Sequence, residues 1–269
     1  FIPMKTLRFL FLSSLVCLLP FTTFAFQPGD STLRVMPKTA FDLGEKLVFR
    51  VHYGWLTAGE ATFEVRKKPV MYNQQECYHL AGEGKTAGSF DWFFKVRDTY
   101  DAFVEKKSLL PLHYTRSVNE GGYQFSDSVF FEHRQKAVKS KKGNHQIPAQ
   151  TQDVLSAIYY ARCLDLSDAV PGDEFKIHTF LDDEVYHLGM KIIGRETIST
   201  NLGKFKCIKI QPKVISGRVF ADTNGMTLWV TDDENHLPIR IESPIIVGTV
   251  KADLKSYSNL KYPLLSKVK

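Results

Sequence analysis

Short runs of alternating hydrophobic and polar residues fill most of the chain between residues 46 and 257. The clearest is KLVFRVHYGWL, residues 46–56, in which Leu47, Phe49 and Val51 alternate with a second set that includes Arg50. A period of two sends successive side chains to opposite faces of a β-strand. The run therefore predicts a strand with an inward face that is rich in aromatic residues.

The next run, TAGEATFEVRKK at residues 57–68, has the same period and follows so closely that the two predict a hairpin around Leu56–Gly59. Glycine-, asparagine- and aspartate-rich turns separate the later runs, which favours antiparallel hairpins in sequence over βαβ units. Further strands are predicted at Glu76–Glu83, Leu112–Val118, Tyr123–His133, Glu174–Leu181, Val185–Thr197, Gly203–Val214, Met226–Asp232, Pro238–Ser243 and Ile246–Tyr257.

One segment, TQDVLSAIYYARCLDL at residues 151–166, breaks this pattern. Its apolar residues, among them Leu155 and Ile158, recur at helical spacing, and Thr151 can cap the amino end. We expect a helix of about four turns packed on the sheet. The stretch SFDWFFKVRD, residues 89–98, predicts a shorter turn of helix.

These elements predict a mainly β fold. We expect one large curved antiparallel sheet, or an open β-barrel or roll, of about ten strands with one packed α-helix at about 151–166. No internal repeat or proline-rich linker divides the chain. We expect a flexible segment at 26–40, a single β-rich domain at 41–260 and a tail at 261–269.

The amino terminus has the order of features of a secretory signal peptide. Lys5 and Arg8 precede an apolar run at 9–19, and small residues lead up to Ala25. We expect a signal peptide at residues 1–25, with residues 1–3 an upstream artefact. A lipid anchor at Cys17 is the alternative, although the bulky Val16 stands where a small residue is expected.

These features predict an exported protein, periplasmic or associated with the outer membrane of a Gram-negative bacterium. No later stretch is long and apolar enough for a transmembrane helix, so none is expected in the mature chain. The formal net charge of the whole chain, +6, is only mildly basic. We expect no nucleic-acid partner, because export and this charge both disfavour one.

Three cysteines follow the signal peptide, so no more than one disulfide can form among them. Cys77 and Cys207 lie in strand-like runs and are the favoured pair. Three buried free thiols, with Cys163 as the third, are an equally good alternative.

The motifs that would indicate catalysis are incomplete. Gly84-Lys85-Thr86 resembles the end of a phosphate-binding loop, but His79 stands where that loop requires glycine. There is no Gly-x-Ser-x-Gly motif. His52, His79, His113 and His187 lie in predicted strands, where a histidine is more often half-buried than a metal ligand. We expect no catalytic residue, no metal site and no cofactor, and the chain is more consistent with a binding protein than with an enzyme.

Several stretches resemble one family of exported bacterial proteins, the domain-of-unknown-function family 3108. They are HYGWLTAGEATFEV, FKVRDTYDAFVEKKSLLPLHYTRSVNEGGY, QDVLSAIYYAR, GKFKCIKIQP and LWVTDDENHLPIRIESPIIVGTVKADL, in one order from about Phe41 to Tyr257. The resemblance implies export and a mostly antiparallel fold. It implies no reaction and no catalytic residue.

Aromatic residues make up 13% of the chain. They are either ordinary core or the lining of a cavity for a hydrophobic molecule, because a curved sheet can leave such a space. The candidate ligand-binding residues are Tyr53, Trp55, Phe63, Tyr78, Trp92 and Phe93.

Three functional hypotheses follow. The first is a non-enzymatic envelope protein that binds or carries a lipid-like ligand, either a lipid or a lipoprotein, in a cavity closed by the helix. The second is a scaffold that binds another envelope protein through a sheet edge or a hairpin. The third is a hydrolase that acts on envelope glycan or lipid. A dry cavity favours the first, an exposed apolar patch the second, and converging titratable groups the third.

Overall fold

The computed structural model describes residues 33–215, 225–245 and 248–268, which lie in one compact unit, Leu33–Lys269. The predicted signal peptide at 1–25, the artefact at 1–3 and the alternative anchor at Cys17 lie outside the described residues. The predicted flexible segment, 26–40, is described only from residue 33 onward.

A single antiparallel sheet of sixteen strands dominates the described residues. Its order is β10-β11-β12-β13-β14-β15-β1-β2-β4-β5-β6-β7-β8-β9, while β3 pairs with β4 and β16 with β12. The strands are β1 (Lys46–Tyr53), β2 (Leu56–Val65), β3 (Val70–Tyr72), β4 (Gln75–Thr86), β5 (Arg97–Glu105), β6 (Pro111–Glu120), β7 (Tyr123–Glu132), β8 (Ala137–Ser140), β9 (Gly143–Gln146), β10 (Glu174–Leu181), β11 (Glu184–Thr200), β12 (Gly203–Ile215), β13 (Thr227–Thr231), β14 (Pro238–Pro244), β15 (Thr249–Ser258) and β16 (Lys267–Val268). The mainly β fold class is confirmed, with more strands than the ten expected.

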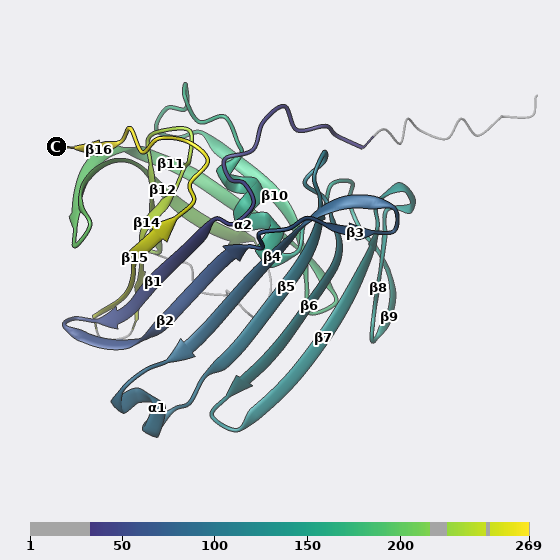
Figure 1. Ribbon diagram of the computed structural model, residues 1–269, viewed down its shortest axis with the longest axis horizontal. Coiled ribbons are helices and arrows are strands. Elements are labelled where there is room, and N and C mark those ends of the chain that lie inside the picture. The colour runs from purple at the N-terminus through teal and green to yellow at the C-terminus, as the bar shows by residue number, and fades with distance from the viewer. Residues whose placement is uncertain (1–32, 216–224, 246–247, 269) are drawn as a thin grey trace, which may run out of the picture. The chain divides into compact units, whose positions relative to one another are not determined.

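The sheet curves around the helix α2 (Val154–Arg162), as Figure 1 shows. This helix contacts β4 and β5 on one side and β10 on the other. One long connection, from β9 to β10, therefore carries the helix into the concave side of the sheet.

The predicted β1–β2 hairpin is confirmed, but its turn is at Gly54-Trp55; the predicted turn residues, Leu56–Gly59, belong to β2. Leu47 is the cross-strand partner of Phe63, and Phe49 is the partner of Ala61, so these four side chains share one face. Gly54 forms the turn with a φ of 55°, a left-handed conformation that glycine adopts at little cost.

The helix predicted at 151–166 is confirmed, but it spans only Val154–Arg162. The predicted cap, Thr151, is wrong. Asp153 caps α2, because its Oδ1 accepts the backbone N–H groups of Leu155 at 2.8 Å and Ser156 at 2.9 Å. The hydroxyl of Ser156 in turn accepts the N–H of Asp153 at 3.0 Å, which completes a capping box. Thr151 instead donates its hydroxyl to the carbonyl of Pro148. The shorter helical turn is confirmed as α1 (Ser89–Phe93).

Several strands were not predicted, and β5 is the most informative. Tyr100, Ala102 and Val104 share one face, but the buried Asp98 precedes them on that face and the apolar Phe103 lies on the other, so the alternation is hard to recognise. The short strands β3, β8, β9 and β16 have too few residues for a period of two to be recognised. A single 3-10 turn, η1 (His133–Gln135), joins β7 to β8.

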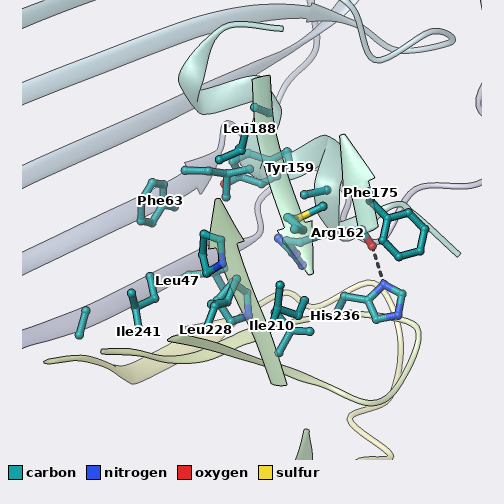
Figure 2. Close-up of a pocket in the computed structure, with 18 of the residues that line it drawn as sticks. Leu47, Phe63, Tyr159, Arg162, Phe175, Leu188, Ile210, Leu228, His236 and Ile241 are labelled. Carbon is teal, nitrogen blue, oxygen red and sulfur yellow. Dashed lines mark hydrogen bonds between the residues drawn. The ribbon is translucent and has the colours of Figure 1, made fainter. Parts of the chain in front are cut away.

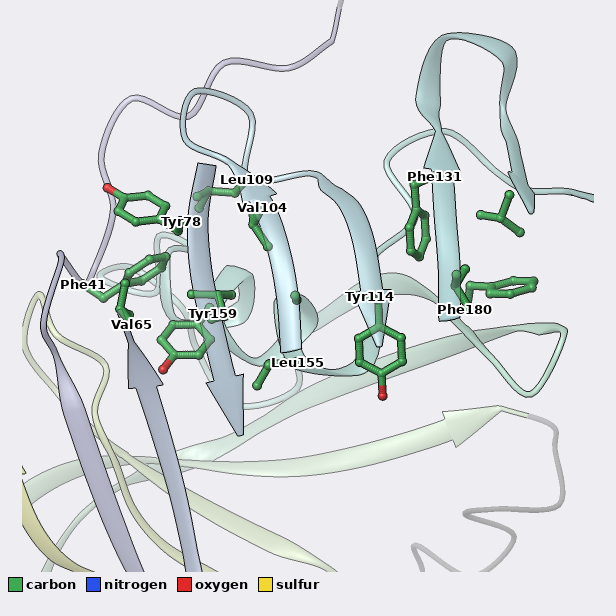
Figure 3. Close-up of a cluster of buried hydrophobic side chains, with 14 of the residues drawn as sticks. Phe41, Val65, Tyr78, Val104, Leu109, Tyr114, Phe131, Leu155, Tyr159 and Phe180 are labelled. Carbon is green, nitrogen blue, oxygen red and sulfur yellow. The ribbon is translucent and has the colours of Figure 1, made fainter. Parts of the chain in front are cut away.

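The buried apolar side chains form three clusters. Figure 3 shows the first, where Tyr78, Tyr114 and Tyr159 pack among aliphatic residues of β4–β7 and α2. The second lies between α2 and β10–β13, and the third between β1 and β12–β15. The 261–269 tail contributes β16, which pairs with β12.

The three cysteines of the described residues are free thiols, so the Cys77–Cys207 disulfide does not form. Burial raises the pKa of the Cys77 thiol to about 11 and that of the Cys207 thiol to about 12. Both thiols are therefore protonated at neutral pH and poor nucleophiles.

Candidate functional site

An apolar cavity of about 270 Å³ lies between α2 and the sheet (Figure 2). Its walls come from β1, β2, α2 and the strands β10 to β15. The lining residues are Leu47, Phe49, Ala61, Phe63, Ala157, Ile158, Tyr159, Ala161, Arg162, Leu166, Phe175, Leu188, Met190, Ile192, Ile210, Pro212, Leu228, Val230, His236, Pro238, Ile241 and Ala252.

One row of cross-strand partners forms the longest wall. It runs over five adjacent strands, and each member is the register partner of the next: Ile192, Ile210, Leu228, Ile241 and Ala252. Partners directly opposite in a sheet point to the same face, so the row presents a continuous aliphatic surface to the cavity.

The helix supplies the opposite wall with unusually small side chains. Ala157 and Ala161 lie one turn apart on the face that lines the cavity, and Ala61 and Ala252 line it from the sheet. Large residues at these four positions would fill the space in the way protein interiors are normally filled. These four small side chains leave part of the space open, while Ile158, Tyr159 and Arg162 line the rest of the helix side.

The charged group of the lining is neutralised within the protein. Arg162 donates to both carboxylate oxygens of Glu45, at 2.6 and 2.9 Å, and to the carbonyl of Asn235 at 3.2 Å. Arg162 and Glu45 are both buried, and such a two-pronged bond satisfies the planar guanidinium well. No uncompensated charge from this pair faces the cavity.

His236 is the second polar residue of the lining. Burial lowers the pKa of His236, so the ring is neutral at pH 7. Its Nδ1–H donates to the carbonyl oxygen of Arg162 at 2.7 Å, the dashed bond in Figure 2. The ring thus holds the carboxyl end of α2 against the loop before β14.

The third polar group of the lining, the hydroxyl of Tyr159, also does not ionise near neutral pH. It is fully buried, and burial raises its pKa far above the neutral range. The described lining contains no carboxylate, serine or thiol that could act as nucleophile or general base. What this cavity can do chemically is exclude water from an apolar molecule.

The six candidate ligand-binding residues lie in three places. Phe63 lines the cavity. Tyr78 is buried in the first core cluster. The remaining four are exposed at the end of the sheet where the β1–β2 turn and α1 lie: Tyr53, Trp55, Trp92 and Phe93. Their role in ligand binding stays a prediction.

Most residues of the lining were not among the candidates predicted from the sequence. The residues missed come from α2 and from β11 to β15, where aliphatic rather than aromatic side chains predominate. Their alternation is visible in IKIQP, where Ile208, Ile210 and Pro212 share one face, but which face meets a cavity depends on the register between distant strands.

Neither a metal site nor a membrane-spanning helix is present among the described residues. Within them, no three histidine, cysteine, aspartate or glutamate side chains come close enough together to hold a metal ion. No helix among them has the length and apolar character needed to cross a bilayer.

Among solved structures, the chain is similar to a β-barrel-like protein of the unknown-function domain DUF1849 from Brucella abortus. The TM-score is 0.52 at 9% identity, over 86% of this chain and 100% of that chain. This likeness concerns the fold alone.

Two further structures have TM-scores below 0.5. One is a protein of Parabacteroides distasonis provisionally named a lipoprotein, with a TM-score of 0.37 at 13% identity over 82% of this chain and 98% of that chain. The other is a Bacteroides fragilis protein provisionally named as exported, with a YmcC-like fold and a TM-score of 0.33 at 9% identity, over 84% of this chain and 100% of that chain.

No curated protein matches the chain. A family model matches residues 48–255, which is most of the sequence and the region that the resemblance to family 3108 covers. The chain therefore belongs to the family described as DUF3108, proteins of unknown function.

Proposed function

We propose that the protein is a non-enzymatic binder of a hydrophobic, lipid-like ligand in the cell envelope. The observation that carries this proposal is the cavity of about 270 Å³ with its almost wholly apolar lining. When no ligand fills a space of that size, its apolar lining lacks the close contacts of a packed interior, which costs free energy. A ligand that fills the space removes this cost.

The lining also indicates which part of a ligand enters. The volume is near the lower end of the range for small-molecule pockets, which suits a hydrocarbon chain better than a whole phospholipid. Arg162 is already bonded to Glu45, so a phosphate or carboxylate inside would find no free counter-charge there. The hydrocarbon part of the ligand is therefore buried, and any charged group stays outside.

The predicted export of the protein also supports this function. The amino-terminal pattern of residues 1–25 is typical of a secretory signal, and an exported protein would meet envelope lipids and lipoproteins. The hydrolase hypothesis gains no comparable support, because the described lining offers no nucleophile or carboxylate.

The test is native mass spectrometry of the mature protein isolated from its own envelope, followed by denaturing extraction and lipid analysis. We expect an excess mass that denaturation releases as a lipid. Ala252→Phe should abolish the excess mass, because the new ring occupies the cavity.

Thr62→Phe is the matched control. Thr62 lies between Ala61 and Phe63 on β2, so its side chain points to the opposite face, and this variant should keep the bound lipid. A bare mass for the wild-type protein, under conditions that retain lipid on a known carrier, would refute the proposal.

A further inference from the structure

Three large aromatic side chains stand almost fully exposed at one end of the sheet. Trp55 is 88% exposed, Trp92 is 91% exposed and Phe93 is 80% exposed. Figure 1 shows the β1–β2 turn, α1 and the β6–β7 turn at this same end. We call residues 53–56, 88–95 and 121–123 together the aromatic loop end. Exposure on this scale is costly in water and marks an interaction surface.

Hydrogen bonds join the segment before α1 to β2, just beyond the β1–β2 turn, and join the end of the α1 loop to the β6–β7 turn. The N–H of Ala87 donates to the carbonyl of Ala58 at 3.0 Å, and the N–H of Gly121 donates to the carbonyl of Lys95 at 2.9 Å. A Cβ at Gly121 would lie 2.3 Å from the ring of Phe94, so this ring packs flat on the glycine. The exposed aromatic residues therefore belong to one surface.

A local ion pair fixes the orientation of α1. The guanidinium of Arg97 donates to both carboxylate oxygens of Asp91, at 2.7 and 2.9 Å, and the hydroxyl of Thr86 donates to Asp91 at 2.8 Å. Asp91 is thus held toward β5. The neighbouring Trp92 and Phe93 project outward as a consequence.

Most of the charges next to this end are paired within the protein; the exceptions are Arg50, which donates to the hydroxyl of Thr57 and the carbonyl of Trp55, and the exposed Lys95. Besides Arg97 with Asp91, Lys85 lies 3.6 Å from Glu60, and Lys251 lies 2.6 Å from Glu242. Because only Arg50 and Lys95 are left without a carboxylate partner among the described residues here, the positive field at this end is weaker than a strongly acidic partner or nucleic acid would need. The aromatic side chains are its main means of binding.

The aromatic loop end also adjoins the wall of the cavity. Ile241 of β14 and Ala252 of β15 are register partners. Two residues away along β15, Val250 pairs with Tyr53 of β1, which precedes the β1–β2 turn. The wall thus comes within about 7 Å of this end, at the rise per residue of a β-strand. The exposure, contacts and charges of the aromatic loop end are independent of the proposed function; only the significance of its closeness to the cavity rests on that function.

We propose that the aromatic loop end docks on the surface of a lipid bilayer, with Trp55, Trp92 and Phe93 inserted among the lipid headgroups. Tryptophan and other aromatic rings favour this interfacial zone, where an apolar body and a polar edge are both accommodated. Side chains that project singly from turns can enter such a soft layer. A protein partner would instead require a closely packed, complementary patch.

The intrinsic tryptophan fluorescence of the wild-type protein reports on this end. The chain has three tryptophans, and the third, Trp229, is buried at 7% exposure. With phosphatidylcholine vesicles we expect a blue shift and protection from aqueous quenchers. We expect the protein to co-sediment with the vesicles equally at about 0.1 M and about 1 M NaCl, because screening does not weaken an uncharged contact.

The variant Trp55→Ser/Trp92→Ser/Phe93→Ser should lower the partition coefficient by at least about tenfold. The matched control is Met71→Ser/Leu265→Ser, which removes two apolar residues that are 67% and 79% exposed elsewhere on the surface, and it should bind as the wild-type protein does. Absence of wild-type co-sedimentation, full binding by the triple variant, or loss of binding in high salt would each overturn the proposal.

A second readout separates this proposal from the function of the cavity. Diphenylhexatriene, an uncharged fluorescent hydrocarbon, should bind the triple variant in solution without vesicles. Ala252→Phe should lose the probe but keep vesicle docking. If vesicle docking fails while the probe still binds, the membrane proposal is wrong and the ligand-binding function stands. If the wild-type protein docks on vesicles but does not bind the probe, the ligand-binding function is wrong and the membrane proposal stands.

Discussion

Two buried carboxylates are stabilised in opposite ways at the two ends of α2. Glu45 is fully buried beside Arg162 and is held by two charge-assisted hydrogen bonds. Asp153 is fully buried at the other end, and its Oδ2 has no partner among the described residues. A buried pair satisfies both of its charges, whereas a buried single carboxylate keeps a desolvation cost when it is ionised.

Asp153 should make the stability of the protein depend on pH. Burial raises its pKa to about 6, above its ordinary value of 3.8. Because the folded state favours the protonated carboxyl, this stabilisation is complete below about pH 4 and is lost as the pH rises through 6. The loss is about 3 kcal/mol for a shift of this size.

The variant Asp153→Asn tests this, because its amide oxygen can still cap Leu155 and Ser156 while the charge is gone. We expect urea unfolding to show a flatter dependence on pH for the variant between pH 4 and 8. At pH 8 it should be at least as stable as the wild-type protein. Parallel curves for the two proteins would mean that Asp153 stays ionised in the folded state at every pH measured.

At the scale of elements, one turn brings the two edges of the sheet together. Asp182 and Asp183 form the β10–β11 turn, and both have positive φ values, 52° and 65°. Asp182 bonds to Arg116 of β6. Asp183 accepts from Ser140 and lies 2.9 Å from Lys142 at the β8–β9 turn. The edge strands β9 and β10 are therefore linked through side chains rather than through a ladder.

Removing the charge of Asp183 should loosen this link without opening the turn. Asn tolerates a positive φ nearly as well as Asp, so Asp183→Asn keeps the backbone and weakens the bonds to Ser140 and Lys142. We expect a loss of about 1–2 kcal/mol in unfolding free energy. Hydrogen exchange should become faster in β8, β9 and the β10–β11 turn.

Asp232→Asn is the control for this variant. Asp232 lies 3.1 Å from Arg195, an exposed pair on a different part of the sheet, and should change stability by less than about 1 kcal/mol. Equal effects of both substitutions, or exchange that rises evenly over the sheet, would show that Asp183 does not hold the edges together.

Local patterns carry enough information to predict most individual elements. Alternation in β1 and β2 predicts the hairpin because each strand is long and has one apolar face. The start of α2 is harder, since Thr151 and Asp153 are both good caps. Asp153 caps it because Ser156 completes its capping box, while Thr151 bonds to Pro148.

At the scale of the whole molecule, the cavity depends on the register between distant strands, which no single stretch of sequence determines. Ile192 and Ala252 lie on one wall because four intervening register pairs connect them. An aromatic residue is a strong local signal, so sequence analysis selected Trp55 and Trp92, which are exposed. Alanines such as Ala61 and Ala252 carry no such signal, although their small size creates the space.

Filling this cavity should stabilise the entire fold. A ligand that binds only the folded state adds about 2.7 kcal/mol at a hundredfold excess over its Kd, which raises the Tm of a domain of this size by about 5–10 °C. Protein isolated with its envelope lipid should therefore melt higher than the same protein after delipidation and refolding, and added lipid should restore the difference. Ala252→Phe should melt at one temperature under all three conditions, since its ring already occupies the site. If delipidation lowers the Tm of this variant as much as that of the wild-type protein, the stabilising lipid binds somewhere other than the cavity beneath α2.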